Sequence, residues 1–181
     1  MKRLLCCGLL LGAASPALAA EIESFENGLK PWRIRPAGVA RLETETVHEG
    51  GKALRFSLEE RGKARLPLEE NDWSKYEAIS FWAYSPRASE AVLGLGLDSE
   101  NPASDGWVYF YLPFPVNWSG WKHFVIPKSR FKASRNPSWE QIKSLFFSTA
   151  DWPFYRLEAG MYVIFDDIRL LTAEEVDALK P

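Results

Sequence analysis

Residues 79–84 read Ile-Ser-Phe-Trp-Ala-Tyr, residues 93–98 read Leu-Gly-Leu-Gly-Leu-Asp, and residues 107–112 read Trp-Val-Tyr-Phe-Tyr-Leu. In each stretch an apolar residue returns at every second position, which is the period of a β-strand that buries one face. Similar short runs, separated by Gly, Pro, Asn and Asp, fall at residues 39–47, 52–58, 64–68, 78–85, 91–98, 107–112, 121–127, 144–150 and 161–171. Nine short strands with little helix between them predict an all-β protein, an antiparallel β-sandwich or barrel.

Two short helices are expected beside these strands. Residues 137–142 can form one helical turn, and Thr172 followed by Glu175 is a capping-box pattern that opens a tail helix running to Leu179. No internal repeat, low-complexity tract or linker divides the chain. We therefore expect a single β-sandwich domain over residues 21–181.

Residues 1–20 have the anatomy of a secretory signal peptide. A basic start is followed by an apolar run over residues 4–14 and by an A-x-A cleavage site at Ala17 and Ala19. The run is shorter than the roughly 20 residues that span a bilayer, so we expect cleavage after Ala19 or Ala20 and no membrane insertion afterwards. The sequence thus predicts an exported protein, periplasmic or secreted.

The two cysteines, Cys6 and Cys7, both lie in this leader. They leave a lipoprotein signal open as an alternative, although no apolar segment precedes them. After cleavage the chain has no disulfide and no thiolate-bound zinc. Removing the leader leaves 20 basic and 24 acidic residues, well interspersed. This mildly acidic balance argues against nucleic acids and anionic membranes as partners.

No catalytic motif stands out in the sequence. His48 and His123 lack metal-ligand spacing, and no G-x-S-x-G elbow is present. Asp98, Asp105 and Asp151 are the acids nearest to aromatic residues expected at the surface. Because a pair of catalytic carboxylates converges only in space, a glycoside hydrolase or polysaccharide lyase stays open as a less favoured alternative to a non-enzyme.

Alternation separates the two faces of each predicted strand. With the leucines, Phe81, Phe110 and Phe147 turned inward, the outward set is Arg55, Trp82, Tyr84, Asp98, Trp107, Tyr109, Tyr111 and Phe146. Gly94 and Gly96 would leave open space beside this set. Aromatic rings stack on the apolar faces of sugars, while hydroxyls, an acid and an arginine bind the sugar hydroxyls. We therefore expect one aromatic-lined trough that binds a glycan; the alternative is that this face packs against loops or a protein.

Five motifs occur in a recognisable order: Ser-Phe-Glu at 24–26, Glu-Gly-Gly-Lys-Ala-Leu at 49–54, Tyr-Glu-Ala-Ile-Ser-Phe-Trp at 76–82, Gly-Trp-Lys-His-Phe-Val-Ile-Pro at 120–127, and Val-Ile-Phe-Asp-Asp-Ile-Arg-Leu at 163–170. The series resembles carbohydrate-binding modules of the galactose-binding-like jelly-roll type, especially family 11. The resemblance implies an antiparallel jelly roll that binds a polysaccharide or oligosaccharide across a concave sheet. It also implies a polysaccharide-active enzyme as partner; a structural or protein-interaction domain is the alternative.

The same resemblance implies a structural Ca²⁺ ion. Its ligands would be the side chains of Glu26, Glu49 and Asp166 and the backbone oxygens of Ser24 and Lys52. Calcium binds several oxygen ligands, carboxylates among them, at about 2.3–2.6 Å. The Gly-Gly turn after Glu49 lets backbone carbonyls approach an ion closely.

Overall fold

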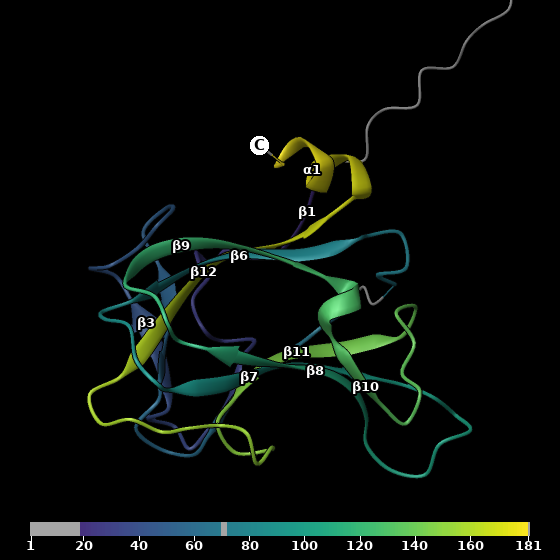
Figure 1. Cartoon of the computed structure of the whole chain (residues 1–181), viewed down its shortest axis with the longest axis horizontal. Helices are drawn as coiled ribbons and strands as arrows, with labels where there is room; N and C mark the ends of the chain where they lie inside the picture. The colour runs from purple at the N-terminus through teal and green to yellow at the C-terminus, as the bar shows by residue number, and fades with distance from the viewer. Residues whose placement is uncertain (1–18, 70–71, 181) are drawn as a thin grey trace, which may run out of the picture.

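A computed structural model describes residues 19–69 and 72–180 and shows two antiparallel sheets packed face to face. In sheet A the order is β3 (Ala40–Glu43), β4 (Ala53–Ser57), β12 (Tyr162–Leu171), β6 (Ala78–Ser85) and β9 (Gly120–Pro127), with β1 (Ala20–Glu23) also paired to β12. In sheet B the order is β10 (Lys132–Ser134), β8 (Val108–Pro115), β7 (Val92–Ser99), β11 (Ile142–Ser148), β5 (Lys63–Pro67) and β2 (Arg33–Arg35). Figure 1 shows β9, β6 and β12 as one layer above β11, β8 and β7.

The core lies between the two sheets. It contains the alternate residues that the sequence assigned inward, among them Phe81, Leu95, Phe110 and Phe147, each almost fully buried. Phe147 of sheet B stacks on Phe165 of sheet A with ring centroids 3.7 Å apart. Burying such side chains drives the pairing of the sheets, at about 1.5–3 kcal/mol per large apolar side chain. The predicted jelly-roll sandwich is confirmed.

All nine predicted strands are present. The prediction overlooked β1, β2 and β10, because strands of three or four residues are too short to show alternation. The helix expected at residues 137–142 is absent: the segment contains a single turn, in which Gln141 N donates to Ser138 O at 3.2 Å, and β11 begins at Ile142. The tail helix is confirmed as α1 (Ala173–Ala178), where Thr172 Oγ1 accepts from Glu175 N and Glu175 Oε2 accepts from Thr172 N at 2.9 Å.

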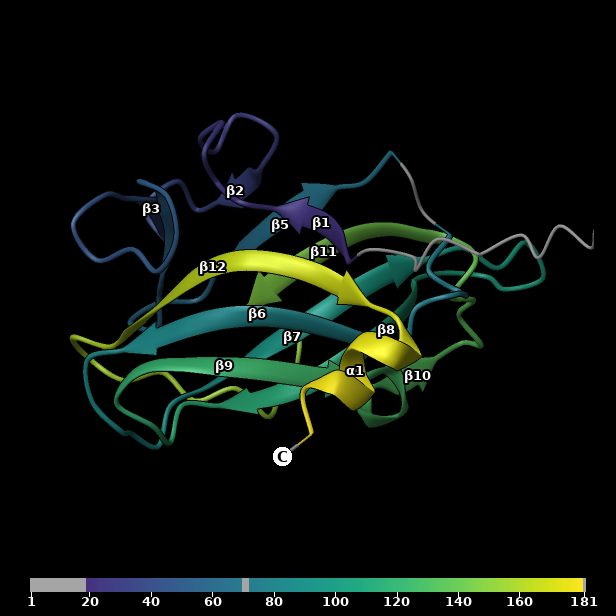
Figure 2. The ribbon, with the colours of Figure 1, turned by 90° about the horizontal axis from the view of Figure 1, so that it is seen from above.

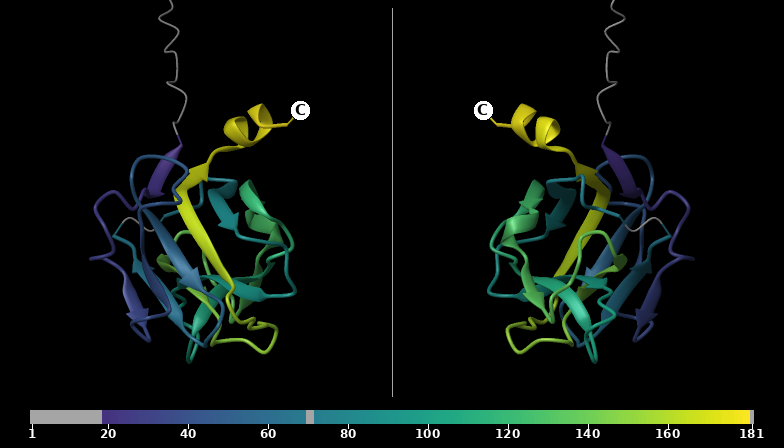
Figure 3. Two further views of the ribbon diagram at one scale, coloured as in Figure 1. Left: turned by 90° about the vertical axis from the view of Figure 1, so that its left-hand side faces the viewer. Right: turned by 90° about the vertical axis from the view of Figure 1, so that its right-hand side faces the viewer.

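The two ends of the described chain lie close together at one end of the sandwich. Ala20 is paired with Leu170, and α1 follows directly on β12 and projects beyond the sheets, as Figures 2 and 3 show. Residues 1–18, which hold most of the expected leader, lie outside the described residues. Among the helices in the described ranges, none has the length and apolar character to cross a bilayer.

Candidate functional site

The eight outward residues do not form one trough. Arg55, Trp82 and Tyr84 lie on β4 and β6 of sheet A, whereas Asp98, Trp107, Tyr109, Tyr111 and Phe146 lie on or beside β7, β8 and β11 of sheet B. The single-trough expectation is therefore wrong. Alternation correctly predicted which side chains of each strand point into the core and which point outward, but it cannot predict which of the two sheets a strand joins. The two groups occupy opposite outer surfaces of the sandwich.

A row of aromatic side chains follows β8 on the outside of sheet B. Trp107, Tyr109 and Tyr111 alternate with the buried Val108, Phe110 and Leu112. Trp107 is 72% exposed, the highest value among the large apolar residues left exposed in the described chain. Tyr109 and Tyr111 lie with ring centroids 5.8 Å apart. The row ends in an indole whose ring is available to a ligand.

The loop after β11 folds back over this row. Trp152 stacks on Phe146 at 5.6 Å and on Tyr111 at 5.5 Å, and Phe154 stacks on Trp152 at 5.4 Å. The expectation that Phe146 is open to a ligand is wrong, because it is only 2% exposed beneath this loop. The space above the two glycines is also filled: a Cβ at Gly96 would stand 2.3 Å from Phe146 Cζ. Aromatic rings therefore make up much of this surface.

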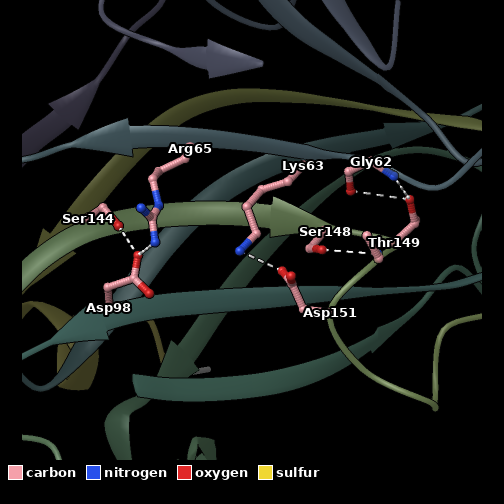
Figure 4. Close-up of polar contacts among 9 residues, drawn as sticks. Gly62, Lys63, Arg65, Asp98, Ser144, Ser148, Thr149 and Asp151 are labelled. Carbon is pink, nitrogen blue, oxygen red and sulfur yellow. Dashed lines mark hydrogen bonds and ion pairs between the residues drawn. The ribbon is translucent and has the colours of Figure 1, made fainter. Parts of the chain in front are cut away.

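Figure 4 shows two charged pairs on sheet B, Arg65 with Asp98 and Lys63 with Asp151. The basic member of each pair lies over the Phe146 ring. Arg65 and the Ser144 hydroxyl both donate to Asp98 Oδ2. Lys63 Nζ lies 2.6 Å from Asp151 Oδ2 and 4.1 Å from the Phe146 ring centroid. Hydrogen-bonding groups of both charges, arginine and lysine beside carboxylates, thus stand next to flat rings.

These side chains enclose two adjoining hollows, which share Asp98, Gly106 and Trp107. The hollow of about 460 Å³ is lined by Lys63, Asp98, Gly106, Trp107, Tyr109, Ser134, Arg135, Phe146, Asp151 and Trp152. Its neighbour, of about 430 Å³, is lined by Arg33, Arg65, Pro67, Asp98, Ser99, Gly106, Trp107, Val108, Lys143 and Ser144. We call the two hollows together with the β8 row the aromatic groove.

Another hollow of about 500 Å³ lies beside β1. It is lined by residues such as Glu23, Trp73 and Tyr76, and its wall includes Glu69 and Asp72, which flank the undescribed residues 70–71. It contains none of the residues singled out from the sequence for sugar binding. The aromatic groove is therefore the better candidate.

The sheet A group has a different environment. The Trp82 indole is stacked against His48 at 3.7 Å and against His123 at 4.8 Å, so its ring is already packed by two side chains. His123 Nε2 lies 2.9 Å from Ser80 Oγ. Burial lowers the pKa of His123, the Asp167 carboxylate opposes that effect, and His48 adds to it.

Arg55 and Tyr84 also have partners on sheet A. The Arg55 guanidinium lies 3.5 Å from the Tyr162 ring centroid and 3.7 Å from the Glu43 carboxylate. Tyr84 lies against Trp121, with ring centroids 5.6 Å apart. These side chains pack with one another over the sheet, and none of them lines the aromatic groove.

Four of the five residues that the resemblance assigned to calcium, Glu26, Glu49, Lys52 and Asp166, lie in or against the loop at residues 48–52. Asp166 Oδ2 accepts from the backbone N–H groups of His48 and Glu49, at 2.8 and 3.0 Å. Asp166 is 1% exposed, and its Oδ1 is buried with no hydrogen-bond partner. Burial raises the pKa of Asp166, against the lowering effect of the backbone N–H groups of Glu49, His48 and Asp167. An unpartnered buried carboxylate oxygen fits a cation ligand.

The other expected ligands are engaged differently. Glu26 Oε1 accepts from the N–H groups of Gly51 and Lys52 at 2.9 Å each, and these bonds lower the pKa of Glu26. The Lys52 ammonium donates to the Glu26 carbonyl oxygen at 2.6 Å, and Glu49 lies 3.6 Å from Arg169. Among the described residues, no side-chain hydrogen bond or ion pair joins Ser24 to this cluster. Within the described ranges, no three acidic or histidine side chains gather as a metal site; Asp166 alone fits.

Sequence reasoning missed several residues of the groove. Trp152 and Phe154 lie in an irregular loop, where no alternation assigns a face; their only signal was two aromatics flanking Pro153. Lys63, Arg65 and Arg135 reach the groove through strand pairing and loop folding that a single sequence does not reveal. Asp98 and Asp151, noted as acids near surface aromatics, do lie in it, whereas Asp105 does not line it.

Comparison with known proteins finds matches among solved structures. No family profile matches the sequence, and no curated protein matches it. Among solved structures, the family 11 carbohydrate-binding module from Clostridium thermocellum, in complex with a β-1,3-1,4-mixed-linked tetrasaccharide, is 21% identical with a TM-score of 0.63, over 87% of this chain and 98% of that one. The family 11 module of the cellulosomal cellulase Lic26A-Cel5E of the same organism is 20% identical with a TM-score of 0.64, over 88% and 97%.

The likeness extends to a second family. The family 30 module of the cellulosomal cellulase Cel9D-Cel44B of Clostridium thermocellum is 15% identical with a TM-score of 0.53, over 88% of this chain and 94% of that one. The fold is thus that of the carbohydrate-binding jelly rolls of families 11 and 30 over most of the chain. Each of these relatives in structure is a binding module.

Proposed function

We propose that this protein binds a polysaccharide or oligosaccharide, without catalysis, in the aromatic groove of sheet B. The observation that carries the proposal is the exposed Trp107 at the end of the β8 row, beside hollows that also present Tyr109, Asp98 and Lys63. Flat rings offer a stacking surface to sugar rings, and the charged groups bind hydroxyls. The likeness to carbohydrate-binding modules supports the same role.

The polar groups of the groove suit binding better than catalysis. Asp98 and Asp151 both line one hollow, but each carboxylate is held by a basic side chain, Arg65 or Lys63. A glycosidase needs one carboxyl group that gives up a proton and another that attacks or activates water. A carboxylate held by a basic side chain serves poorly as the proton donor of such a pair, whereas it fixes the orientation of the arginine or lysine donor beside it.

The experiment is affinity gel electrophoresis against a panel of soluble polysaccharides. Trp107→Ala and Tyr109→Ala should lose retardation, since a stacked ring contributes about 1–3 kcal/mol, judged by base stacking on aromatics. Trp121→Ala and Tyr84→Ala remove the same residue types from sheet A and should keep wild-type retardation. The opposite pattern would move the site to sheet A, and no effect from any variant would refute glycan binding through aromatic side chains. Reducing ends released from the retained polysaccharide would show that the protein is an enzyme.

We also propose a structural Ca²⁺ ion beside Asp166, where the buried, unpartnered Oδ1 supports a cation. Glu26, Glu49 and the carbonyls of Ser24 and Lys52 are the further oxygens that the family resemblance suggests. For these to take part, the Lys52 ammonium would have to leave the Glu26 carbonyl oxygen. Such an ion would tie β12 to the loop at residues 48–52.

Export remains part of the proposal. Cleavage after Ala19 or Ala20 would leave β1 paired with β12 almost intact, because β1 begins at Ala20. N-terminal sequencing of the protein recovered from periplasm or culture medium should begin at Ala20 or Glu21. Recovery of uncleaved chain in the cytoplasm would contradict export. A polysaccharide-active enzyme as partner would be detected by co-purification from the same fraction.

A further inference from the structure

Basic side chains gather at one side of the aromatic groove, on the strand pair β2–β5. Arg33 lies directly opposite Arg65, and Arg35 lies directly opposite Lys63. Between them Ile34 faces the fully buried Ala64, so the four basic residues share the outer surface of sheet B. Like charges placed opposite each other in a sheet destabilise it modestly. This strand pair therefore bears a concentration of positive charge next to the hollows.

Only part of this charge is neutralised. Arg65, Lys63 and Lys143 pair with Asp98, Asp151 and Glu100 respectively. Among the described residues, no carboxylate forms an ion pair with Arg33, Arg35 or Arg135. Arg33 lines one hollow and Arg135 lines the other, where its guanidinium donates to the Asp105 carbonyl oxygen. Each hollow thus contains one arginine with no bound carboxylate.

We propose that the aromatic groove selects anionic polysaccharides, in which carboxylate or sulfate groups on the sugars meet Arg33 and Arg135. This inference rests on the proposed glycan binding and adds the substrate class. The whole chain carries a net charge of −2, whereas the surface beside the groove carries arginines without a paired carboxylate. The local charge there is therefore opposite in sign to the net charge of the chain. A guanidinium presents a planar fork of donors that matches a carboxylate in two parallel hydrogen bonds. Stacking on Trp107 and ion pairing at both flanks would act on one chain together.

The experiment compares polymers that share a backbone and differ in charge. Polygalacturonate is paired with its methyl ester, carboxymethyl cellulose with hydroxyethyl cellulose, and dextran sulfate with dextran. In affinity electrophoresis at 50 mM salt, we expect at least one charged polymer to bind about tenfold more tightly than its neutral partner. The preference should shrink at 500 mM salt, where the Debye length falls to between about 3 and 10 Å. Which charged polymer binds distinguishes carboxylate from sulfate recognition.

Variants connect the preference to the groove. Arg33→Gln should weaken binding of the charged polymer about threefold to tenfold, and Arg33→Glu should weaken it further. Because Arg33 lines the groove, binding of the neutral partner can change as well, but by a smaller factor, so that the preference for the charged polymer shrinks. Arg135→Gln should act in the same direction on the other hollow. The matched control is Arg41→Gln, since Arg41 is an exposed arginine opposite Arg55 on sheet A. Circular dichroism and thermal melting establish that each variant is folded.

The possible failures are distinguishable. Equal or stronger binding of neutral polymers that still depends on Trp107 would overturn the charge selection and leave the proposed glycan binding intact. Binding of dextran sulfate that ignores both Trp107 and Arg33 would be charge attraction alone and would overturn the selection as well. If no polymer of either kind binds, the proposed function fails together with the inference.

Discussion

Gly94 lies directly beneath the indole of Trp152: a Cβ at residue 94 would stand 2.1 Å from Trp152 Cζ3 and 2.3 Å from Cε3. Because glycine has no side chain, the indole can lie directly against sheet B, where Trp152 stacks on Tyr111 and Phe146. Trp152 is 8% exposed, so the ring is packed down on the strands. The shape of the aromatic groove therefore depends on the absence of one methyl group.

Gly94→Ala should displace Trp152, destabilise the fold by about 1–3 kcal/mol as overpacking does, and weaken glycan binding. Urea unfolding measures the first effect and affinity electrophoresis the second. The decisive control is a double-mutant cycle, because in a Trp152→Ala background the added methyl group has no ring to meet. If the loss of stability in the double variant equals the sum of the losses in the two single variants, the contact between residue 94 and the indole is not the cause of the destabilisation.

Asp98→Asn should remove the counter-charge of Arg65 and reduce the free energy of unfolding by about 1–2 kcal/mol, because hydrogen bonds to charged groups contribute about 1.5–3 kcal/mol and this pair is partly exposed. The Ser144 hydroxyl loses its charged acceptor in the same variant. Asp151→Asn provides the comparison, since the Lys63–Asp151 pair is more exposed and should contribute about 0–1 kcal/mol. Equal effects in urea unfolding would contradict the structural role given to Asp98.

Calcium should raise the melting temperature of the wild-type protein, whereas the melting temperature of the Asp166→Asn variant should be the same with and without calcium. A ligand at a hundred times its dissociation constant stabilises the folded state by about 2.7 kcal/mol. Differential scanning fluorimetry with millimolar CaCl₂ against a strong chelator measures the difference, and MgCl₂ at the same concentration tests selectivity. An identical midpoint for wild type in calcium and chelator would exclude a structural ion that contributes to stability.

The protein should lose stability as the pH falls below the ordinary histidine value of about 6.5, partly through His123. Burial lowers the folded-state pKa of His123, so the unfolded chain takes up the proton first and is favoured as the pH falls. The stability that the neutral His123 contributes is therefore fully present above pH 6.5. It is lost as the pH falls from 6.5 toward the lower pKa of His123 in the folded protein. His123→Gln, which can still bond to Ser80, should show a shallower fall in melting temperature between pH 7.5 and pH 5.5 than wild type. A steeper fall in the variant would contradict a lowered pKa for His123 in the folded protein.

The alternation in the sequence was sufficient to predict the sandwich and the orientation of its side chains. Phe81, Leu95, Phe110 and Phe147 all lie in the core, as their alternate positions required. The capping box at Thr172 and Glu175 likewise predicted α1, because its hydrogen bonds are local in the chain. These features depend on residues only a few positions apart.

The location of the groove depends on contacts between distant residues. Trp82 and Tyr109 both point outward, but strand order places β6 in sheet A and β8 in sheet B. Trp152 reaches Gly94 only because its loop folds back over β7, a path with no periodic signal. Arg33 becomes part of the groove through the pairing of β2 with β5, across about thirty residues of sequence. Interactions of this kind are set by the assembled sandwich.

The indole N–H signals of the eight tryptophans offer the most direct test of the binding surface. In ¹⁵N-correlated NMR spectra recorded while the best-binding oligosaccharide is added, the signals of Trp107 and Trp152 should shift in a saturable way. Those of Trp82 and Trp121, on the other sheet, should stay in place. Shifts at Trp82 and Trp121 with none at Trp107 and Trp152 would contradict the assignment of the sugar to sheet B.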